Sequence, residues 1–477
     1  MVETVIGVSM RVARTIKRVY ILFGIALFSY ACGSEIGEAA STEFPTPAES
    51  VLTTTPLRIP DPTRTLTRTV SPTPIPTDLP NATQTTEPGI FTSDWVVSGY
   101  DAGNTHWNRM ENVLYPPLER KWTQAFPYRG NRYFDGILIA DGRVLVTTSQ
   151  GMKKHILYAF SEERGSLSWT FPLTGGGGGS MCNDAAAVDG MVYFSGQHDK
   201  NIYAMDIKKN YIKWTLPLHG RMECGLSPLV EGNNVILGLT NWPPKRESEW
   251  RSGTVISLNL QSREVNWSRD IVTGISSMII ESKVVVVGSS SNILGLDINS
   301  GAILWQSPGF PFSDLASYNG KVIENGFCER SIRAHTYDHG TLLWEHKFPD
   351  RTCVTMAIIE NYLYLGEYNY NDLGDRWTEE RDQFRTNVEY PSVYVLDIST
   401  GEVISQRKGF SNIYSIVGAN GVVYISSAHD GIYALDKNSL ETLWKKDIDY
   451  DSNLAIANGI LYEVDMWLIN AYGPIVK

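Results

Sequence analysis

The chain has 477 residues, which is enough for several small domains or for one large domain built from repeats. It carries 41 Lys and Arg residues against 52 Asp and Glu residues, a formal net charge of −11. It therefore lacks the basic excess that would hold a phosphate backbone, and we expect no nucleic acid partner. Its 13 Trp and 24 Tyr residues suit the pleated surfaces of a strand-rich protein.

The N-terminus has the order of an export signal. Basic residues up to Arg18 precede an apolar run over residues 19–31 that is short for a membrane-spanning helix. The run ends at Cys32 and resembles a bacterial lipoprotein signal, which implies that residues 1–31 are removed and that Cys32 receives lipid. Ser29 and Ala31 also suit an ordinary signal-peptidase site, so simple secretion is one alternative and an uncleaved anchor is another.

Residues 32–92 are predicted to be a disordered stalk between the lipid and the folded domain. Roughly half of the residues between Ser41 and Ile90 are Thr or Pro. Pro removes backbone donors and favours extended polyproline II, and the segment has too little apolar surface to offset the entropy of ordering. We therefore expect an exported protein that contacts the bacterial cell membrane through its lipid anchor only.

From about residue 93 the chain repeats one unit of short strands and tight turns. In one copy Asp189-Gly190 precedes Val192-Tyr193-Phe194 and the unit ends at Trp214, and another copy runs from Asn420-Gly421 to Trp444. Such β-branched and aromatic runs bounded by Gly, Asn and Asp are typical of strands joined by hairpins. Asp is expected to bond turn amides, Gly to take positive φ, and the Trp to dock between adjacent units.

The markers of the outer strand give the number of units. The closest spacing, from Trp267 to Trp305, leaves room for one four-stranded sheet. One marker position holds Ser405 instead of Trp, and we expect poorer packing in that unit. The eight markers are Trp122, Trp169, Trp214, Trp267, Trp305, Trp344, Ser405 and Trp444.

The repeat spelling Ala-x-Asp-x-x-Thr-Gly followed by Trp resembles the pyrroloquinoline-quinone-like (PQQ-like) propeller repeat family. Asp94-Trp95, Asp101 and Asn104-Thr105 resemble the lead-in before the first blade of that family, and the resemblance covers residues 93–477. Members include quinoprotein alcohol dehydrogenases and the BamB-type lipoproteins of outer-membrane barrel assembly. The resemblance implies an all-β, eight-bladed β-propeller of four-stranded antiparallel blades, in agreement with the eight markers.

The last blade lacks one strand of its own. After Trp444 the chain supplies three further strands, whereas Lys121-Trp122-Thr123 has the outer-strand marker with no strands before it. We therefore expect an N-terminal strand to complete the last blade and close the ring, which would remove open sheet edges.

Two insertions interrupt the repeats, over residues 241–252 and 367–392, each between the second and third strands of its blade. In a propeller both would emerge on the face that carries the blade-to-blade connections, including the glycine run 175–179. Loops on a rigid scaffold often carry function. Their aromatic and charged residues suit protein or sugar contact, and a self-packed loop is the alternative. The candidate binding residues are Trp242, Trp250, Tyr368, Tyr370, Trp377, Phe384 and Tyr390.

The sequence offers no catalytic, cofactor-binding or metal-binding residues that we would assign. The eight His residues show no zinc-binding spacing. The quinone dehydrogenases of the family carry a pair of adjacent cysteines near the cofactor, and this chain has none. We therefore expect neither PQQ nor enzyme activity, because a shared fold does not establish a shared function.

Four cysteines remain once Cys32 is assigned to lipid. An even number in an exported protein is compatible with disulfides, with buried free thiols as the alternative. The two nearest-neighbour pairings join Cys182 with Cys224 and Cys328 with Cys353.

Three readings of function follow from these observations. The first is a membrane-tethered, non-catalytic interaction platform whose partner is an envelope or extracellular protein. The second is a propeller that binds a glycan or small ligand, and the third is a PQQ-dependent dehydrogenase. The sequence favours the platform.

Overall fold

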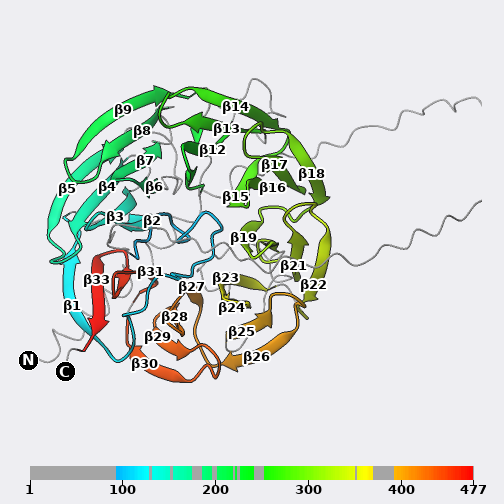
Figure 1. Cartoon of the computed structure of the whole chain (residues 1–477). Helices are drawn as coiled ribbons and strands as arrows, with labels where there is room; N and C mark the ends of the chain where they lie inside the picture. Colours follow the sequence, from blue (N-terminus) through cyan, green and yellow to red (C-terminus); the bar gives the residue numbers. More distant parts are fainter. Residues whose placement is uncertain are drawn as a thin grey trace, which may run out of the picture. The chain divides into compact units, whose positions relative to one another are not determined.

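The computed structural model describes residues 93–127, 132–150, 154–173, 185–195, 201–218, 221–222, 226–240, 252–349, 352–368, 391–448 and 450–475. Within these ranges the chain forms strands and no helix. The strands make eight antiparallel sheets, arranged as blades around one axis (Figure 1). This confirms the predicted eight-bladed β-propeller. The predicted signal, the Cys32 lipidation site and the stalk lie outside the described residues.

We number the blades in chain order. Blade 1 contains β2 (Arg132–Ala140), β3 (Arg143–Gln150), β4 (Lys154–Ser161) and β5 (Leu167–Leu173). Blade 2 contains β6 (Ala185–Val188), β7 (Met191–Ser195), β8 (Asn201–Asp206) and β9 (Tyr211–Pro217). Blade 3 contains β10 (Arg221–Met222), β11 (Leu229–Glu231), β12 (Asn234–Thr240), β13 (Gly253–Asn259) and β14 (Val265–Ile271). Blade 4 contains β15 (Ile275–Glu281), β16 (Val284–Ser289), β17 (Asn292–Asp297) and β18 (Ile303–Pro308).

Blade 5 contains β19 (Asp314–Tyr318), β20 (Lys321–Asn325), β21 (Ser331–Thr336) and β22 (Leu342–Lys347). Blade 6 contains β23 (Cys353–Ile359), β24 (Tyr362–Tyr368), β25 (Ser392–Asp397) and β26 (Val403–Lys408). Blade 7 contains β27 (Ile413–Ala419), β28 (Val422–Ser427), β29 (Gly431–Asp436) and β30 (Thr442–Lys446). Blade 8 contains β31 (Asn453–Ala457), β32 (Ile460–Val464), β33 (Leu468–Pro474) and the N-terminal strand β1 (Leu118–Ala125).

The turns have the chemistry that the repeats predict. Between β27 and β28, Asn420 and Gly421 have φ of 47° and 76°, as a two-residue hairpin with positive φ at both positions requires. Between β25 and β26, the Asp397 carboxylate accepts hydrogen bonds from the backbone N–H of Ser399 at 2.7 Å and of Thr400 at 3.0 Å. Gly401 ends that turn with φ of 72°.

The outer-strand tryptophans hold neighbouring blades together. The Trp267 indole in blade 3 donates its Nε1–H to the Ile298 carbonyl of blade 4 at 2.8 Å. Its ring covers Gly301, where an added Cβ would lie 2.4 Å from Trp267 Cε3. The same donation to the next blade occurs from Trp122, Trp169, Trp305 and Trp344. The predicted docking of Trp between blades is therefore confirmed.

The blade with Ser405 differs from our expectation of poor packing. Ser405 pairs with Val395, whereas the residues opposite the tryptophans are smaller, as at Gly295 opposite Trp305 and Ala334 opposite Trp344. Val395 and Leu440 are 4% and 1% exposed and belong to one apolar cluster. Larger aliphatic side chains occupy this boundary in place of the missing indole.

The ring closes as predicted. β1 pairs with β33 in antiparallel register, with Trp122 opposite Ala471, and this places the N-terminal strand on the outside of blade 8. Blade 3 departs from four strands, because β10 and β11 each pair with β12. Pro228, which cannot donate a ladder hydrogen bond, directly precedes β11.

A strap of residues 93–108 crosses the centre of the ring (Figure 1). It bonds to the innermost strands of seven blades within two residues of the end of each strand, next to the turn into the second strand. We call this end of the propeller the turn face. The bonded inner-strand residues are Ile139, Ala186, Ile280, Ser317, Ile358, Gly418 and Ile456. In blade 5 the Asn104 side chain also reaches the start of the innermost strand.

Candidate functional site on the loop face

The opposite end of the propeller, which we call the loop face, carries the blade-to-blade connections and both insertions. One insertion leaves after β12 and returns at β13, and the other leaves after Tyr368 and returns at Pro391. The described part of the strap bonds mainly at the turn face, and its Asn104 side chain reaches Asp314 and the Leu315 carbonyl at the start of β19. Of the candidate binding residues, Tyr368 lies within the described chain. The others, Trp242, Trp250, Tyr370, Trp377, Phe384 and Tyr390, lie outside it.

The two stems of the longer insertion are bonded to each other through Glu367. Its carboxylate is 5% exposed and accepts hydrogen bonds from the Ser392 backbone N–H at 2.8 Å and the Tyr394 hydroxyl at 3.0 Å. Burial, together with the nearby Glu367 charge, raises the pKa of Tyr394 to about 12, so its hydroxyl keeps its proton and donates. The insertion therefore leaves from a fixed base.

Tyr368 connects that base to the next blade. Its ring stacks on Tyr414 of β27, with centroids 5.9 Å apart and an interplanar angle of 29°. Offset-stacked aromatic pairs at such distances stabilise a structure by more than the burial of their apolar area alone. Blades 6 and 7 are thus joined directly beneath the insertion.

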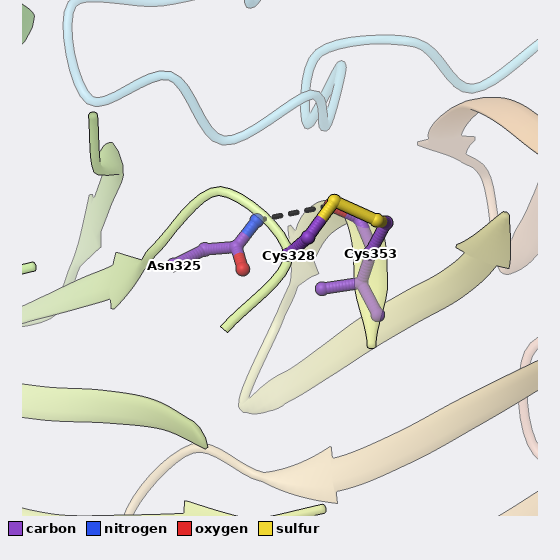
Figure 2. Close-up of a disulfide and its surroundings, with 4 residues drawn as sticks. Asn325, Cys328 and Cys353 are labelled. Carbon is purple, nitrogen blue, oxygen red and sulfur yellow. Dashed lines mark hydrogen bonds between the residues drawn. A yellow bond between two sulfur atoms is a disulfide. The ribbon is translucent and has the colours of Figure 1, made fainter. Parts of the chain in front are cut away.

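A disulfide joins blade 5 to the base of the longer insertion in blade 6. Cys328, in the loop between β20 and β21, is bonded to Cys353 at the start of β23, and Figure 2 shows the bridge. Asn325 donates its side-chain N–H to the Val354 carbonyl at 2.9 Å beside the bridge (Figure 2). Cys353 is also the register partner of Tyr368. This is one of the two pairings that the sequence left open, and Cys182 and Cys224 of the other pairing lie outside the described residues.

One carboxylate faces inward beside these loops. Asp314, at the start of β19, accepts hydrogen bonds from the Asn104 side chain at 3.3 Å and the Ser277 hydroxyl at 3.4 Å. Its side chain reaches solvent, but the strap and blade 4 enclose it, and this burial raises its pKa to about 6. At neutral pH the group still carries most of a negative charge.

Sequence reasoning missed three loop-face aromatic residues, namely Tyr414, Phe312 and Phe327. Tyr414 follows a core Ile at the start of an inner strand, and only the register shows which neighbour it meets. Phe312 and Phe327 are 72% and 50% exposed, and neither belongs to a repeat position or an insertion. The sequence signal that could have indicated Phe327 is its place next to Cys328.

Comparisons with known proteins support the predicted repeat family. Residues 153–311 match the family model described as outer membrane protein assembly factor BamB, which is less than half of the chain. No curated protein sequence matches the chain. The match and the fold together confirm the resemblance to PQQ-like propellers.

Solved structures share the fold at low identity. Quinohemoprotein alcohol dehydrogenase from Comamonas testosteroni is 12% identical with a TM-score of 0.59, and the alignment covers 81% of each chain. BamB from Moraxella catarrhalis is 14% identical with a TM-score of 0.51, over 75% of this chain and 99% of BamB. The computationally designed Ika8 protein is 12% identical with a TM-score of 0.55, over 73% of this chain and 98% of Ika8. These likenesses show the fold and no particular function.

No quinone site can be assigned from the residues that the structure describes. The sequence has no adjacent cysteine pair, and Cys328 and Cys353 are separated by 25 residues. In the part of the chain that the structure describes, no three His, Cys, Asp or Glu side chains gather where a metal ion could be held. We therefore derive no chemistry through a quinone. The same part of the chain also contains no helix suited to crossing a membrane.

Proposed function

We propose that this chain, a PQQ-like β-propeller, is a non-catalytic platform that binds another protein of the cell envelope through its loop face. One observation carries the proposal: the loop-face ends of blades 5, 6 and 7 are fixed to one another. The Cys328–Cys353 disulfide joins the first two, and the stack of Tyr368 on Tyr414 joins the second and third. Fixed stems present loops at a low conformational cost on binding.

The position of Ser93, where the strap starts, also supports binding through the loop face. The Ser93 backbone N–H donates to Asn458 Oδ1 at 2.9 Å, and Asn458 lies in the turn that follows β31 on the turn face. A tether that reaches the propeller at Ser93 arrives at the end opposite the loop face. A lipid on Cys32 would then hold the protein at the membrane and leave the loop face accessible. If so, Cys32→Ala moves the protein from the membrane pellet to the soluble fraction, and unchanged pelleting would refute this anchor.

The platform is tested by cross-linked capture from an envelope extract. The test variant replaces residues 369–390 with a short Gly-Ser linker between Tyr368 and Pro391, which keeps the Glu367 bonds to Ser392 and Tyr394. The control variant, Leu304→Ala, removes a half-exposed side chain from the outer strand β18. We expect wild type and control to enrich the same protein and the loop variant to lose it. Direct binding is then measured with the purified partner. If wild type enriches no protein over a mock bait, the platform proposal fails.

A separate assay tests the non-catalytic part of the proposal. The purified protein is incubated with PQQ and calcium, and dye reduction is followed with a series of alcohols. We expect the rate to equal that of the protein-free control. Saturable, alcohol-dependent reduction would assign the chain to the dehydrogenases instead.

A further inference from the structure

Two exposed phenylalanines flank the loop-face end of the β19–β20 hairpin in blade 5. β19 and β20 pair with Asp314 opposite Asn325 at that end of the hairpin. Phe312 comes two residues before this pair and Phe327 two residues after it, so both belong to the turns that leave the same end of the hairpin. They are 72% and 50% exposed. Exposed large apolar side chains in one place mark interaction sites more often than a single one does.

The backbone at Phe312 is held in an uncommon conformation. Its φ is 53°, in the left-handed region that bulky residues rarely adopt. Two residues earlier, Phe310 is buried under the Arg333 guanidinium, which lies 3.9 Å from the ring centroid. The connection between β18 and β19 therefore buries Phe310 and turns Phe312 outward. Strained backbone that displays a side chain to solvent is typical of binding positions.

The loop that carries Phe327 is pinned to blade 6. Cys328 is bonded to Cys353, the Glu329 carbonyl accepts the Thr352 N–H at 3.1 Å, and the Arg330 carbonyl accepts the Phe348 N–H at 2.7 Å. An aromatic side chain on a loop held at three successive residues loses little freedom when a partner binds. The loop that carries Phe327 is thus preorganised, and Phe312 adds a second exposed ring at the same end of the hairpin.

Negative charge accompanies the two phenylalanines. Asp314 directly follows the connection that displays Phe312, and Glu329 lies two residues after Phe327. Among the residues that the structure describes, no Lys, Arg or His forms an ion pair with either carboxylate. Arg330, which is exposed, is the one basic residue between β20 and β21. Counted over the described residues Asp314, Glu329 and Arg330, the charge beside the two phenylalanines is therefore net acidic.

We propose that Phe312 and Phe327 anchor an apolar segment of a partner protein that carries a Lys or Arg side chain, and that Asp314 pairs with this cation. The inference rests on the proposed platform function and narrows it to one patch and one chemistry of partner. Aromatic anchors flanked by a charged group that faces a complementary charge are the usual composition of a binding hot spot.

The test uses two labelled peptides of about a dozen residues with the same leucines, one with lysines and the other with glutamates between them. Binding to the full chain is followed by fluorescence anisotropy at low and high salt. The test variants are Phe312→Ala, Phe327→Ala and Asp314→Asn, where Asn keeps a carbonyl to accept from Asn104 and Ser277. The matched controls are Leu304→Ala for an exposed apolar residue and Asp338→Asn for a carboxylate on an outer hairpin turn. Thermal unfolding confirms that each variant folds.

We expect the lysine peptide to bind saturably and at least about tenfold more tightly than the glutamate peptide, with each test variant weakening it about tenfold and the controls leaving it unchanged. Equal losses in test and control variants would mean attraction to the overall negative charge and would overturn the inference. The inference would also be overturned if both peptides bound equally, or if the chain bound lipid vesicles but neither peptide. Self-association of the chain that Phe312→Ala abolishes would overturn it as well. A captured partner that still binds Phe312→Ala and Phe327→Ala would overturn this patch and leave the platform proposal standing.

Discussion

Leu440 stands opposite Ser405 across the boundary of blades 6 and 7 in the same relation as a glycine to a tryptophan at other boundaries. The Arg407 side chain donates to the Leu440 carbonyl at 2.6 Å, as Arg269 donates to Gly301 at 2.8 Å two residues after Trp267. Leu440 also keeps the left-handed backbone of the glycine, with φ of 59°. At this boundary Ser405 thus takes the place of the tryptophan, and Leu440 takes the place of the glycine beneath it.

This exchange predicts a coupled set of mutations. Ser405→Trp alone should lower the free energy of unfolding by about 1–3 kcal/mol, because Val395 and Leu440 fill the space that the ring needs. Leu440→Gly alone should cost about 2–4 kcal/mol through the cavity that it leaves. The triple variant with Ser405→Trp, Leu440→Gly and Val395→Ala should recover most of both losses. Denaturant unfolding of all variants measures the coupling, and strictly additive losses would contradict the relationship.

The glycine beneath each tryptophan gives a second prediction. Gly301→Ala places a Cβ 2.4 Å from Trp267 Cε3 at a φ of 65°, so it suffers both a clash and backbone strain. Gly142→Ala is the matched control, since φ there is 72° and nothing lies within 4 Å of the added Cβ. We expect Gly142→Ala to cost about 1 kcal/mol from strain. Gly301→Ala should cost about 2 kcal/mol more from the displaced ring, measured by thermal unfolding, and equal losses would argue against ring contact.

The features that sequence could predict are those that a short segment specifies by itself. The Trp marker recurs in all blades but one, and the Asp turn and the positive-φ glycine recur in several, so blade number and ring closure followed from them. The lead-in motif of residues 93–108 was recognised, but its path across the ring could not be predicted, because its bonds to the blades are mostly made by backbone groups. Phe312 was missed for a related reason, since its exposure depends on one backbone torsion.

A buried acid in the closing blade predicts a pH dependence of stability. Glu463 is 1% exposed and accepts hydrogen bonds from Tyr472 and Asn470, both at 3.0 Å. Burial is the main cause that raises its pKa from 4.5 to about 7, and the charge of Asp465 adds to it. Above pH 4.5 the unfolded chain ionises while the folded protein stays protonated, so this group lowers stability as the pH rises from about 4.5 to 7.

Glu463→Gln removes that dependence. The variant should match wild type near pH 4.5 and exceed its free energy of unfolding by up to about 3 kcal/mol above pH 7. Glu111→Gln is a control of opposite sign. Burial alone would raise the Glu111 pKa, but hydrogen bonds from Gly459, Leu114, Ser93 and Val113 lower it overall. That variant should lose stability above pH 4.5, and parallel pH profiles for both variants would refute the assignment.

The disulfide predicts a local contribution to stability. Cys328 and Cys353 close a loop of 25 residues, and removing such a crosslink costs about 3 kcal/mol in the chain-entropy account. The double variant Cys328→Ser/Cys353→Ser should lose about this amount, measured by denaturant unfolding without reductant. Amide exchange at Thr352 and Phe348, whose N–H groups bond to the same loop, should quicken more than exchange in blade 2. Unchanged exchange at these two amides would show that hydrogen bonds alone hold the loop.

The last prediction concerns Asn108, the strap residue that bonds to blade 8. This side chain is fully buried, donates to the carbonyls of Ser93 at 2.6 Å and Ile456 at 2.7 Å, and accepts from the N–H of Glu111 at 3.1 Å. Asn108→Ala leaves these buried groups unpaired and should cost about 2–4 kcal/mol.

The strap should also loosen along its length, because most of its other bonds to the blades are backbone hydrogen bonds, one or two at each blade. The N–H groups of Ile139, Ile280 and Ile358 donate to strap carbonyls at 2.8 Å each, so their hydrogen exchange should quicken in Asn108→Ala. Asn438→Ala, at an exposed position in the outer turn of blade 7, should leave both stability and exchange unchanged. If Asn108→Ala loses stability while exchange at these three isoleucines stays at the wild-type rate, Asn108 stabilises blade 8 alone and the strap does not act as one unit.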